Sequence, residues 1–266
     1  MRVAVRCPAK INLFLSVGPA AAGGYHPIRT VFQAIGLFDH LGIDTDATTT
    51  TVTFDDPSIP AENTVTKTLR LLPELVDLPP LKITIKKCIP SEAGLGGGSS
   101  NAAGLLRGLQ QLGIQLEDAE AANIASGVGA DAGFFLVGGR AKGEGFGERL
   151  TPLTDSERSW IAIVKPDVGV STPEAYRSLD ALPRALRDWQ DEVFNDFESV
   201  APEVCQKIIS GLLKIGASSA SLCGSGSACF GVFKDEGAAM NATQSFGDLQ
   251  TFVAPTLTRA ESLWIA

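Results

Sequence analysis

Apolar and polar side chains alternate from the start of the chain, with the two-residue period of a β-strand. The alternation begins at Val3 and resumes after Pro8. It predicts one strand face with Ile11, Leu13, Leu15 and Val17, and an opposite face with Lys10, Asn12 and Phe14. Lys10 and Asn12 are therefore expected to project together toward a pocket. Taken alone, Lys10 is also explained by a solvated lysine at a sheet edge.

A strand, a glycine-rich loop and a helix follow one another in the first half. Residues 81–86 alternate like a strand, and residues 99–112 carry leucines at helical spacing. Glycines fill positions 94 and 96–98 between them. A helix N-terminus offers free N–H groups to an anion, and glycines let the anion approach. Ser99 and Ser100 add hydroxyls for phosphate or Mg²⁺. A tight helix entry, packed for steric reasons, explains the same residues equally well.

After residue 112 the pattern predicts further helices and strands. A helix at about 117–126 precedes Gly129-Ala130-Asp131, and an apolar segment, 134–137, follows it. From residue 156 the pattern predicts β-α-β-β-α-β with an extra helix in the first crossover, the order of a ferredoxin-like domain. In this pattern Thr172 is the expected N-cap and Pro173 the first residue of a helix. Residues 150–155 are the predicted boundary between a domain of residues 1–155 and one of residues 156–266.

The expected strands and helices of this second domain are a strand at 160–164, a helix after residue 172, a helix at 203–214, strands at 217–222 and 228–233, a helix at 237–246 and a strand at 250–253.

Composition narrows the function classes. The chain has 266 residues, 44% of them apolar, and 22 basic against 30 acidic side chains give a net charge of −8. This balance argues against nucleic-acid and membrane-surface partners, which favour a basic face. Five cysteines without a C-x-x-C pair suit reduced thiols in the cytoplasm, and two histidines exclude multi-histidine zinc sites. No apolar stretch is long enough for a membrane span, so we expect a soluble, untargeted protein.

Several common active-site motifs are absent from the sequence. It contains no Walker A loop, no protein-kinase catalytic loop and no G-x-S-x-G elbow. Residues 127–132 fit the dinucleotide pattern G-x-G-x-x-A, but they follow a helix where that fingerprint requires a strand. We interpret this match as accidental.

Five short motifs occur in a characteristic order along nearly the whole chain: Pro8-Ala9-Lys10-Ile11-Asn12-Leu13, Gly24-Tyr25-His26, the loop of residues 90–100, Gly129-Ala130-Asp131 and Gly224-Ser225-Gly226-Ser227. Together they resemble the GHMP small-molecule kinases. The resemblance implies an α+β fold of two domains, the first like domain 2 of ribosomal protein S5 and the second ferredoxin-like. It also implies phosphoryl transfer from ATP, with Mg²⁺, to an alcohol.

The opening motif joined to Gly-Tyr-His is most similar to members that act on a cytidine diphosphate conjugate of methylerythritol and phosphorylate its 2-hydroxyl. By this resemblance Asp131 is the catalytic base and Lys10 its cationic partner. A positioned carboxylate accepts the proton of a weakly nucleophilic alcohol, and a neighbouring lysine favours its ionised form. No residue is assigned to Mg²⁺.

The resemblance also assigns the binding residues. ATP phosphates are expected at Pro90, Ser91, Glu92, Ala93, Gly94, Leu95, Gly96, Gly97, Gly98, Ser99 and Ser100. The substrate is expected at Asn12, Tyr25, His26, Phe32 and Tyr176. Tyr25 and Phe32 would sandwich the cytosine, because stacking accepts a flat base, and His26 would bond its polar edge. Asn12 would contact the substrate, and Tyr176 would be a further aromatic near it.

Three departures from the family pattern stand out. Glu92 places a charge in a phosphate loop and is expected to point outward. Ala132-Gly133 replaces the usual Val-Pro pair after Asp131, and Ala22-Gly23 replaces an acidic residue before Gly-Tyr-His.

Two other functions compete with this interpretation. One is a GHMP kinase for another alcohol, such as homoserine or mevalonate, and Tyr25, His26 and Phe32 argue against it. The other is a non-catalytic nucleotide- or RNA-binding protein of the same fold, and the net charge and the Lys10/Asp131 pair argue against it. A monomer and a homodimer are equally compatible with the sequence.

Overall fold

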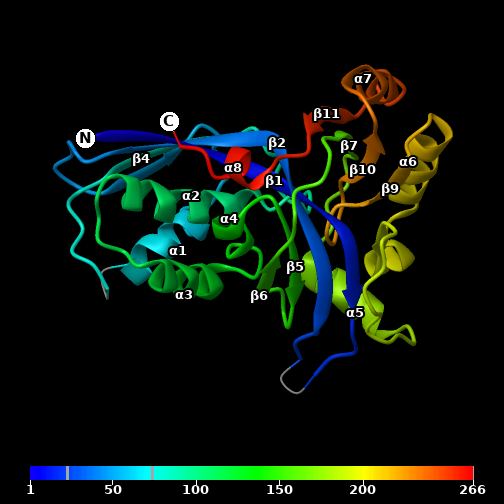
Figure 1. Cartoon of the computed structure of the whole chain (residues 1–266), viewed down its shortest axis with the longest axis horizontal. Helices are drawn as coiled ribbons and strands as arrows, with labels where there is room; N and C mark the ends of the chain where they lie inside the picture. Colours follow the sequence, from blue (N-terminus) through cyan, green and yellow to red (C-terminus); the bar gives the residue numbers. More distant parts are fainter. Residues whose placement is uncertain (22–23, 73–74, 266) are drawn as a thin grey trace.

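The computed structural model describes residues 1–21, 24–72 and 75–265. Its two longest strands are antiparallel neighbours. β1 (Arg2–Val17) pairs with β2 (Ile28–Asp44) along their whole length. Both strands run from the first sheet into the region between the two halves of the molecule (Figure 1). Ala22-Gly23 joins these strands and lies outside the described residues.

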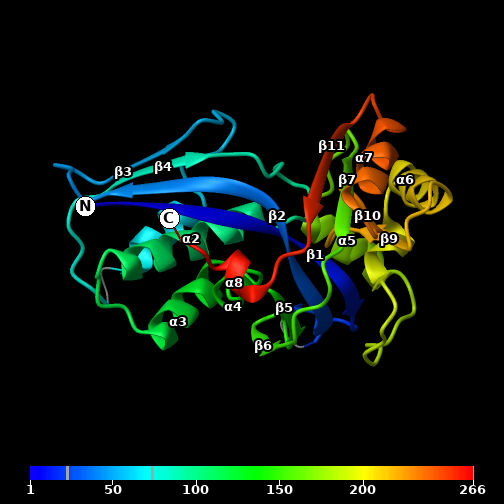
Figure 2. The ribbon, with the colours of Figure 1, turned by 45° about the horizontal axis from the view of Figure 1, so that its top comes forward.

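The first sheet has the order β3-β4-β2-β1-β8, and β5 pairs with β2 and β6. Its helices pack against one face, where they bury a core of Val, Ile and Leu side chains (Figure 2). The other strands of this sheet are β3 (Thr51–Phe54), β4 (Lys82–Lys86), β5 (Arg140–Glu144), β6 (Arg149–Pro152) and β8 (Phe194–Asn195). Its helices are α1 (Thr64–Leu71), α2 (Gly97–Gln111), α3 (Asp118–Val128) and α4 (Phe134–Val137).

The second sheet is antiparallel and has the order β11-β7-β10-β9. Counted along the second half, this order is 4-1-3-2, so the predicted ferredoxin-like pattern is confirmed. The strands are β7 (Trp160–Lys165), β9 (Ser219–Leu222), β10 (Cys229–Phe233) and β11 (Gln250–Pro255). The helices are α5 (Thr172–Asp180), the 3₁₀ helix η2 (Asp196–Val200), α6 (Glu203–Lys214) and α7 (Glu236–Gln244).

The chain ends on the first half of the molecule. After β11, Leu257 packs in the same cluster as Phe32, α8 (Arg259–Ser262) follows, and Ile265 forms a bridge to Val5. Both termini lie beside the first sheet in Figure 1. The division at residue 155 stays a prediction. In the structure, β8 and residues 256–265 pack on the first half of the molecule.

The face assignments of Phe14 and Leu15 along β1 are wrong, because Leu15, expected opposite Lys10, lines the same cavity as Lys10 and Asn12. The ladder with β2 shifts register between Pro8 and Ala9 and again between Asn12 and Phe14. Phe14 therefore packs against Trp189 and Phe194, with ring centroids 5.8 and 5.6 Å away, and does not share the face of Lys10. A two-residue period assumes an unbroken ladder, and a bulge resets it.

None of the helices in the described part of the chain combines the length and the apolar character needed to cross a membrane.

Candidate functional site

Three adjoining cavities lie along the groove between the glycine loop, β1 and α5. The central cavity, about 340 Å³, is lined by Lys10, Asn12 and Asp131. It shares Gly94, Gly96 and Ser99 with the loop cavity, about 380 Å³, and Ala130, Phe146, Thr172 and Tyr176 with the aromatic cavity, about 660 Å³. The central cavity thus connects a glycine-lined space to an aromatic one.

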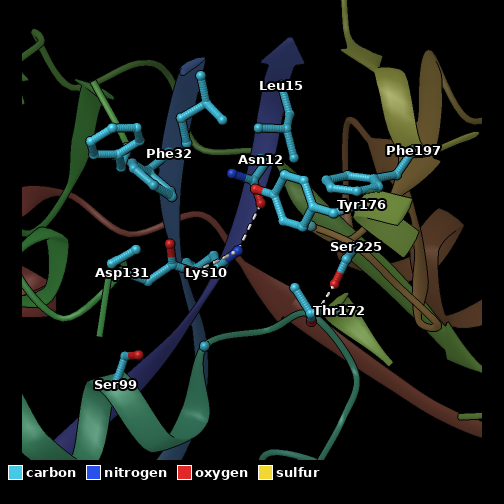
Figure 3. Close-up of a pocket in the computed structure, with 16 residues that line it drawn as sticks. Lys10, Asn12, Leu15, Phe32, Ser99, Asp131, Thr172, Tyr176, Phe197 and Ser225 are labelled. Carbon is cyan, nitrogen blue, oxygen red and sulfur yellow. Dashed lines mark hydrogen bonds and ion pairs between the residues drawn. The ribbon is translucent and has the colours of Figure 1, made fainter. Parts of the chain in front are cut away.

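An ion pair marks the centre of this groove. The Lys10 ammonium lies 3.1 Å from the Asp131 carboxylate, and the lysine side chain is 4% exposed against 29% for the aspartate. The Lys10 amide also donates to the Leu95 carbonyl at 3.0 Å, which fixes β1 to the glycine loop. Figure 3 shows Lys10 and Asp131 facing each other across the cavity. The structure therefore brings these two predicted residues together in one pocket.

A buried chain of hydrogen bonds orients Lys10. Its ammonium donates to Asn12 Oδ1 at 2.7 Å, Asn12 Nδ2 donates to Thr30 Oγ1 at 2.7 Å, and Thr30 donates to the Phe14 carbonyl at 2.8 Å. Asn12 is 2% exposed and Thr30 is fully buried. Thr30 was not identified from the sequence, because its partner is 18 residues away and no spacing rule joins them.

We expect Thr30→Val to lower the free energy of unfolding by about 1–3 kcal/mol, because it leaves the buried Asn12 amide without an acceptor. Denaturant unfolding measures the loss. Thr30→Ser keeps the hydroxyl and should recover most of it, and Thr53→Val, at an exposed threonine, should change little. Equal losses at positions 30 and 53 would contradict the importance of this hydrogen bond.

The glycine loop enters α2 two residues earlier than predicted. The helix begins at Gly97, with Gly96 as its N-cap at φ +74°. Added side chains would clash at Gly96, whose Cβ would lie 2.8 Å from Phe135. The loop cavity is lined by residues 90–99 together with Asn63, Thr64 and Lys87. Glu92 is exposed, as expected, at φ +54°.

Asp39 anchors the segment that leads into this loop. Its fully buried carboxylate accepts from the amides of Cys88 and Ile89 at 2.7 and 2.8 Å and from Asn101 Nδ2 at 3.0 Å. It also pairs with Lys87. Asp39 and Lys87 were missed in the sequence because 48 residues separate them. The only local sign of this anchor in the sequence is Lys87, a lysine shortly before the glycine loop.

The aromatic cavity gathers Tyr25, His26 and Tyr176 from two distant parts of the chain. The ring of Tyr25, 68% exposed, packs against Phe146 with centroids 5.6 Å apart. His26 stacks on Tyr176 at 4.8 Å. Burial, and to a lesser degree the Asp131 charge, raises the pKa of Tyr176 to about 12, so its hydroxyl stays protonated. Phe146, on the turn between β5 and β6, was not identified from the sequence.

Phe32 and Tyr25, which were predicted to sandwich the cytosine, line different cavities. Phe32 lies on β2 between β1 and β5, is 1% exposed and stacks on Phe134 at 4.8 Å. It lines the central cavity, whereas Tyr25 lines the aromatic cavity. Phe134 and Phe135 pack in the same cluster as Phe32, and this explains the burial of the ring.

Helix α5 begins one residue before the position expected from the sequence. Ser171 is the N-cap, and Thr172 and Pro173 are the first two helical residues. Thr172 is therefore free to share a hydrogen bond of 2.8 Å with Ser225, whose Gly-Ser-Gly-Ser turn lines the central cavity (Figure 3).

Oxygen atoms of several side chains at the site could contribute to binding a metal ion. Within residues 1–21, 24–72 and 75–265, no group of three or more His, Cys, Asp or Glu side chains could hold a metal ion. Asp131 and Ser99 line the central cavity, and the buried Ser100 hydroxyl has no hydrogen-bond partner. A carboxylate and hydroxyls of this kind suit a Mg²⁺ ion that takes its other ligands from water and phosphate.

Comparisons with known proteins agree with this geometry. Residues 63–139 match the family model "GHMP kinases N terminal domain" and residues 174–248 match "GHMP kinases C terminal". A 4-diphosphocytidyl-2-C-methyl-D-erythritol kinase of Solibacter usitatus is 35% identical, over 98% of this chain and 91% of its own. One of Parabacteroides distasonis is 39% identical, over 85% of this chain and 90% of its own.

Solved structures give the same picture. A crystal structure of 4-(cytidine 5'-diphospho)-2C-methyl-D-erythritol kinase superposes with a TM-score of 0.81 at 29% identity, over 95% of this chain and 98% of that one. The homoserine kinase of Cytophaga hutchinsonii has a TM-score of 0.75 at 19% identity, covering 100% and 97%, which shows a shared fold.

Proposed function

The chain belongs to the GHMP kinase family, and we propose that it transfers the γ-phosphoryl group of ATP to the 2-hydroxyl of 4-diphosphocytidyl-2-C-methyl-D-erythritol. The observation that carries this proposal is the place of the Lys10–Asp131 pair, between a cavity suited to phosphates and a cavity suited to a base. A bisubstrate reaction needs its proton acceptor where the two ligands meet.

Asp131 acts as the general base in this proposal. Its carboxylate accepts the proton of the substrate hydroxyl as the oxygen attacks the γ-phosphorus, and the bond to the β-phosphate oxygen breaks, releasing ADP. Lys10, held by Asn12, places a positive charge beside the reacting oxygens. Because its side chain is 4% exposed, water screens this charge little.

The residues of the loop cavity would hold the ATP phosphates. The first turn of α2 presents the amides of Gly97, Gly98 and Ser99, and Ser99 lines both the loop cavity and the central cavity. Ser99, beside the phosphates, is a residue that would help to hold Mg²⁺, and the ion would supply positive charge that neutralises the transferring group. Lys87, whose charge is paired with Asp39, lines the same cavity.

The aromatic cavity would hold the cytosine. Tyr25, which packs on Phe146, offers a ring face, and the stacked rings of His26 and Tyr176 line the same cavity. In this proposal Phe32 is a wall of the central cavity next to the reacting groups. The partner is a small molecule. A cytoplasmic location, no nucleic-acid or membrane partner, and a monomeric or homodimeric state remain predictions.

An assay of ATP turnover against a panel of alcohols tests the function directly. We expect phosphorylation of the cytidyl compound and poor turnover of homoserine, galactose and mevalonate, which supply no base for the aromatic cavity. Efficient turnover of one of these three, with none of the cytidyl compound, would leave the family assignment intact and overturn the substrate.

We expect Tyr25→Ala to raise the KM for the cytidyl substrate by about 5–150-fold, because a stacked ring contributes about 1–3 kcal/mol. The KM for ATP should hardly change, since ATP would occupy the loop cavity. Steady-state kinetics with each substrate varied in turn measures both constants. Tyr25→Phe keeps the ring and should be mild. Equal effects of the two variants would show that the hydroxyl, and not the ring face, does the binding.

A further inference from the structure

His26 is held by its neighbours in one orientation. Its side chain is 7% exposed, its ring stacks on Tyr176, and its Nε2 lies 2.9 Å from Asp180 Oδ1. Asp180 ends α5, 154 residues along the chain from His26. Within the described part of the molecule no hydrogen bond involves Nδ1 of His26. This nitrogen therefore remains available to a ligand in the aromatic cavity, which His26 lines.

Asp180 is itself held from a second direction. Arg184 donates to the same Oδ1 atom at 2.6 Å, and the Arg184 side chain, 9% exposed, donates with its Nε to the Gly18 carbonyl at 3.3 Å. The hydrogen bonds from His26 and then Arg184 hold the pKa of Asp180 below its ordinary value. An ionised carboxylate only accepts hydrogen bonds. His26 must therefore carry a proton on Nε2, the nitrogen that faces Asp180.

We propose that Asp180 is a positioning residue that makes the free Nδ1 of His26 a hydrogen-bond acceptor and so selects cytosine over uracil. In a neutral imidazole, a proton on Nε2 leaves the lone pair on Nδ1. This lone pair accepts from the 4-amino group of cytosine. Uracil presents a carbonyl oxygen at the same place, so two acceptors would face each other. The inference rests on the proposed function, because it assumes that the aromatic cavity holds the base.

The first test compares the cytidyl substrate with its uridine counterpart. For Asp180→Ala we expect the ratio of the two kcat/KM values to fall by about tenfold, the worth of roughly one hydrogen bond. The loss should come from a raised KM for the cytidyl substrate, with kcat nearly unchanged. A purely structural role would lower turnover of both substrates equally and leave the ratio unchanged.

Two variants provide controls. In Asp180→Asn the amide oxygen can stay between His26 and Arg184, so most of the selectivity should be recovered. Glu174→Gln makes the same change of charge on an exposed side chain of α5 and should leave the ratio unaltered. If Asp180→Ala keeps the wild-type ratio, or if Glu174→Gln loses it equally, the proposal is wrong.

The second test needs no substrate. The chain has only two histidines, so ¹⁵N imidazole spectra are simple to assign with a His40→Gln variant. At pH 8.5 we expect wild-type His26 to carry its proton on Nε2, the nitrogen that faces Asp180. Asp180→Ala should move the two nitrogen signals toward each other. A wild-type spectrum with a proton on Nδ1 would overturn the proposal.

The two tests separate the possible failures. If the wild-type protein does not phosphorylate the cytidyl compound, the proposed function and the base selectivity fall together, whatever the spectra show. If it does so without preferring cytidine to uridine, only the role of Asp180 and His26 in selectivity is overturned.

Discussion

Asp131→Asn should lower kcat for phosphorylation of the cytidyl substrate by about 10²–10⁴-fold, the usual contribution of a positioned base. The amide keeps the size and polarity of the carboxylate but cannot take up the proton of the attacking hydroxyl. Substrate binding should change much less, because the aromatic and loop cavities are left intact. Steady-state kinetics and calorimetric titration of each ligand measure the two effects separately.

Asp188→Asn is the matched control for this variant. Asp188 pairs with Arg29 while 95% exposed, so its replacement should cost under about 1 kcal/mol of stability and leave kcat as it was. Near-normal turnover in Asp131→Asn would remove Asp131 from the role of base. A loss of both kcat and calorimetric binding would point instead to a disturbed Lys10, which is 3.1 Å away.

The second domain could be predicted in outline because its elements are short, alternating and joined in sequence order. The helix at 203–214 was placed at its observed bounds, and the strand order followed from the pattern of elements. The central strand β2 carried no such signal. Its residues from Thr30 to Ile35 are all buried, the polar Thr30 and Gln33 among them, so no alternation of apolar and polar side chains marks an outer face.

The proposed catalytic pair, Lys10 and Asp131, was predictable because both residues belong to short local motifs, whereas the residues that support them were not. Thr30 acts through Asn12, and Asp180 acts through His26, over separations of 18 and 154 residues. Each contact depends on how strands and helices pack, which a pattern of single residues does not contain. Phe32 was predicted to stack on the ligand, and the structure adds that its ring is 1% exposed, packs on Phe134 and lines the central cavity.

The glycines of the loop were explained either by phosphate binding or by close packing at the helix entry. The structure shows close packing at two of them. A Cβ on Gly94 or Gly96 would overlap other parts of the protein, so these two glycines allow close packing. Gly97 and Gly98 begin α2 and line the loop cavity, where an anion could approach their amides. The phosphate-binding interpretation of these two stays a prediction.

Gly94→Ala should lower the free energy of unfolding by about 2–4 kcal/mol, which corresponds to a fall in Tm of about 5–15 °C. Gly94 has φ +74°, and a Cβ there would overlap the carbonyl oxygen of Cys223 and lie 2.7 Å from its carbonyl carbon. The obstacle is backbone, so no side chain can rotate to relieve it. Because the overlap joins the glycine loop to the turn after β9, both elements must shift.

Gly113→Ala separates this overlap from the cost of the backbone conformation. Gly113 has φ +85°, and a Cβ there would meet nothing within 4 Å. Its replacement should therefore cost only the left-handed conformation, about 1 kcal/mol. Thermal unfolding of the two variants, followed by circular dichroism, gives the difference. If both variants lose the same stability, the contact with Cys223 does not limit residue 94, and the loop can move away from the turn at little cost.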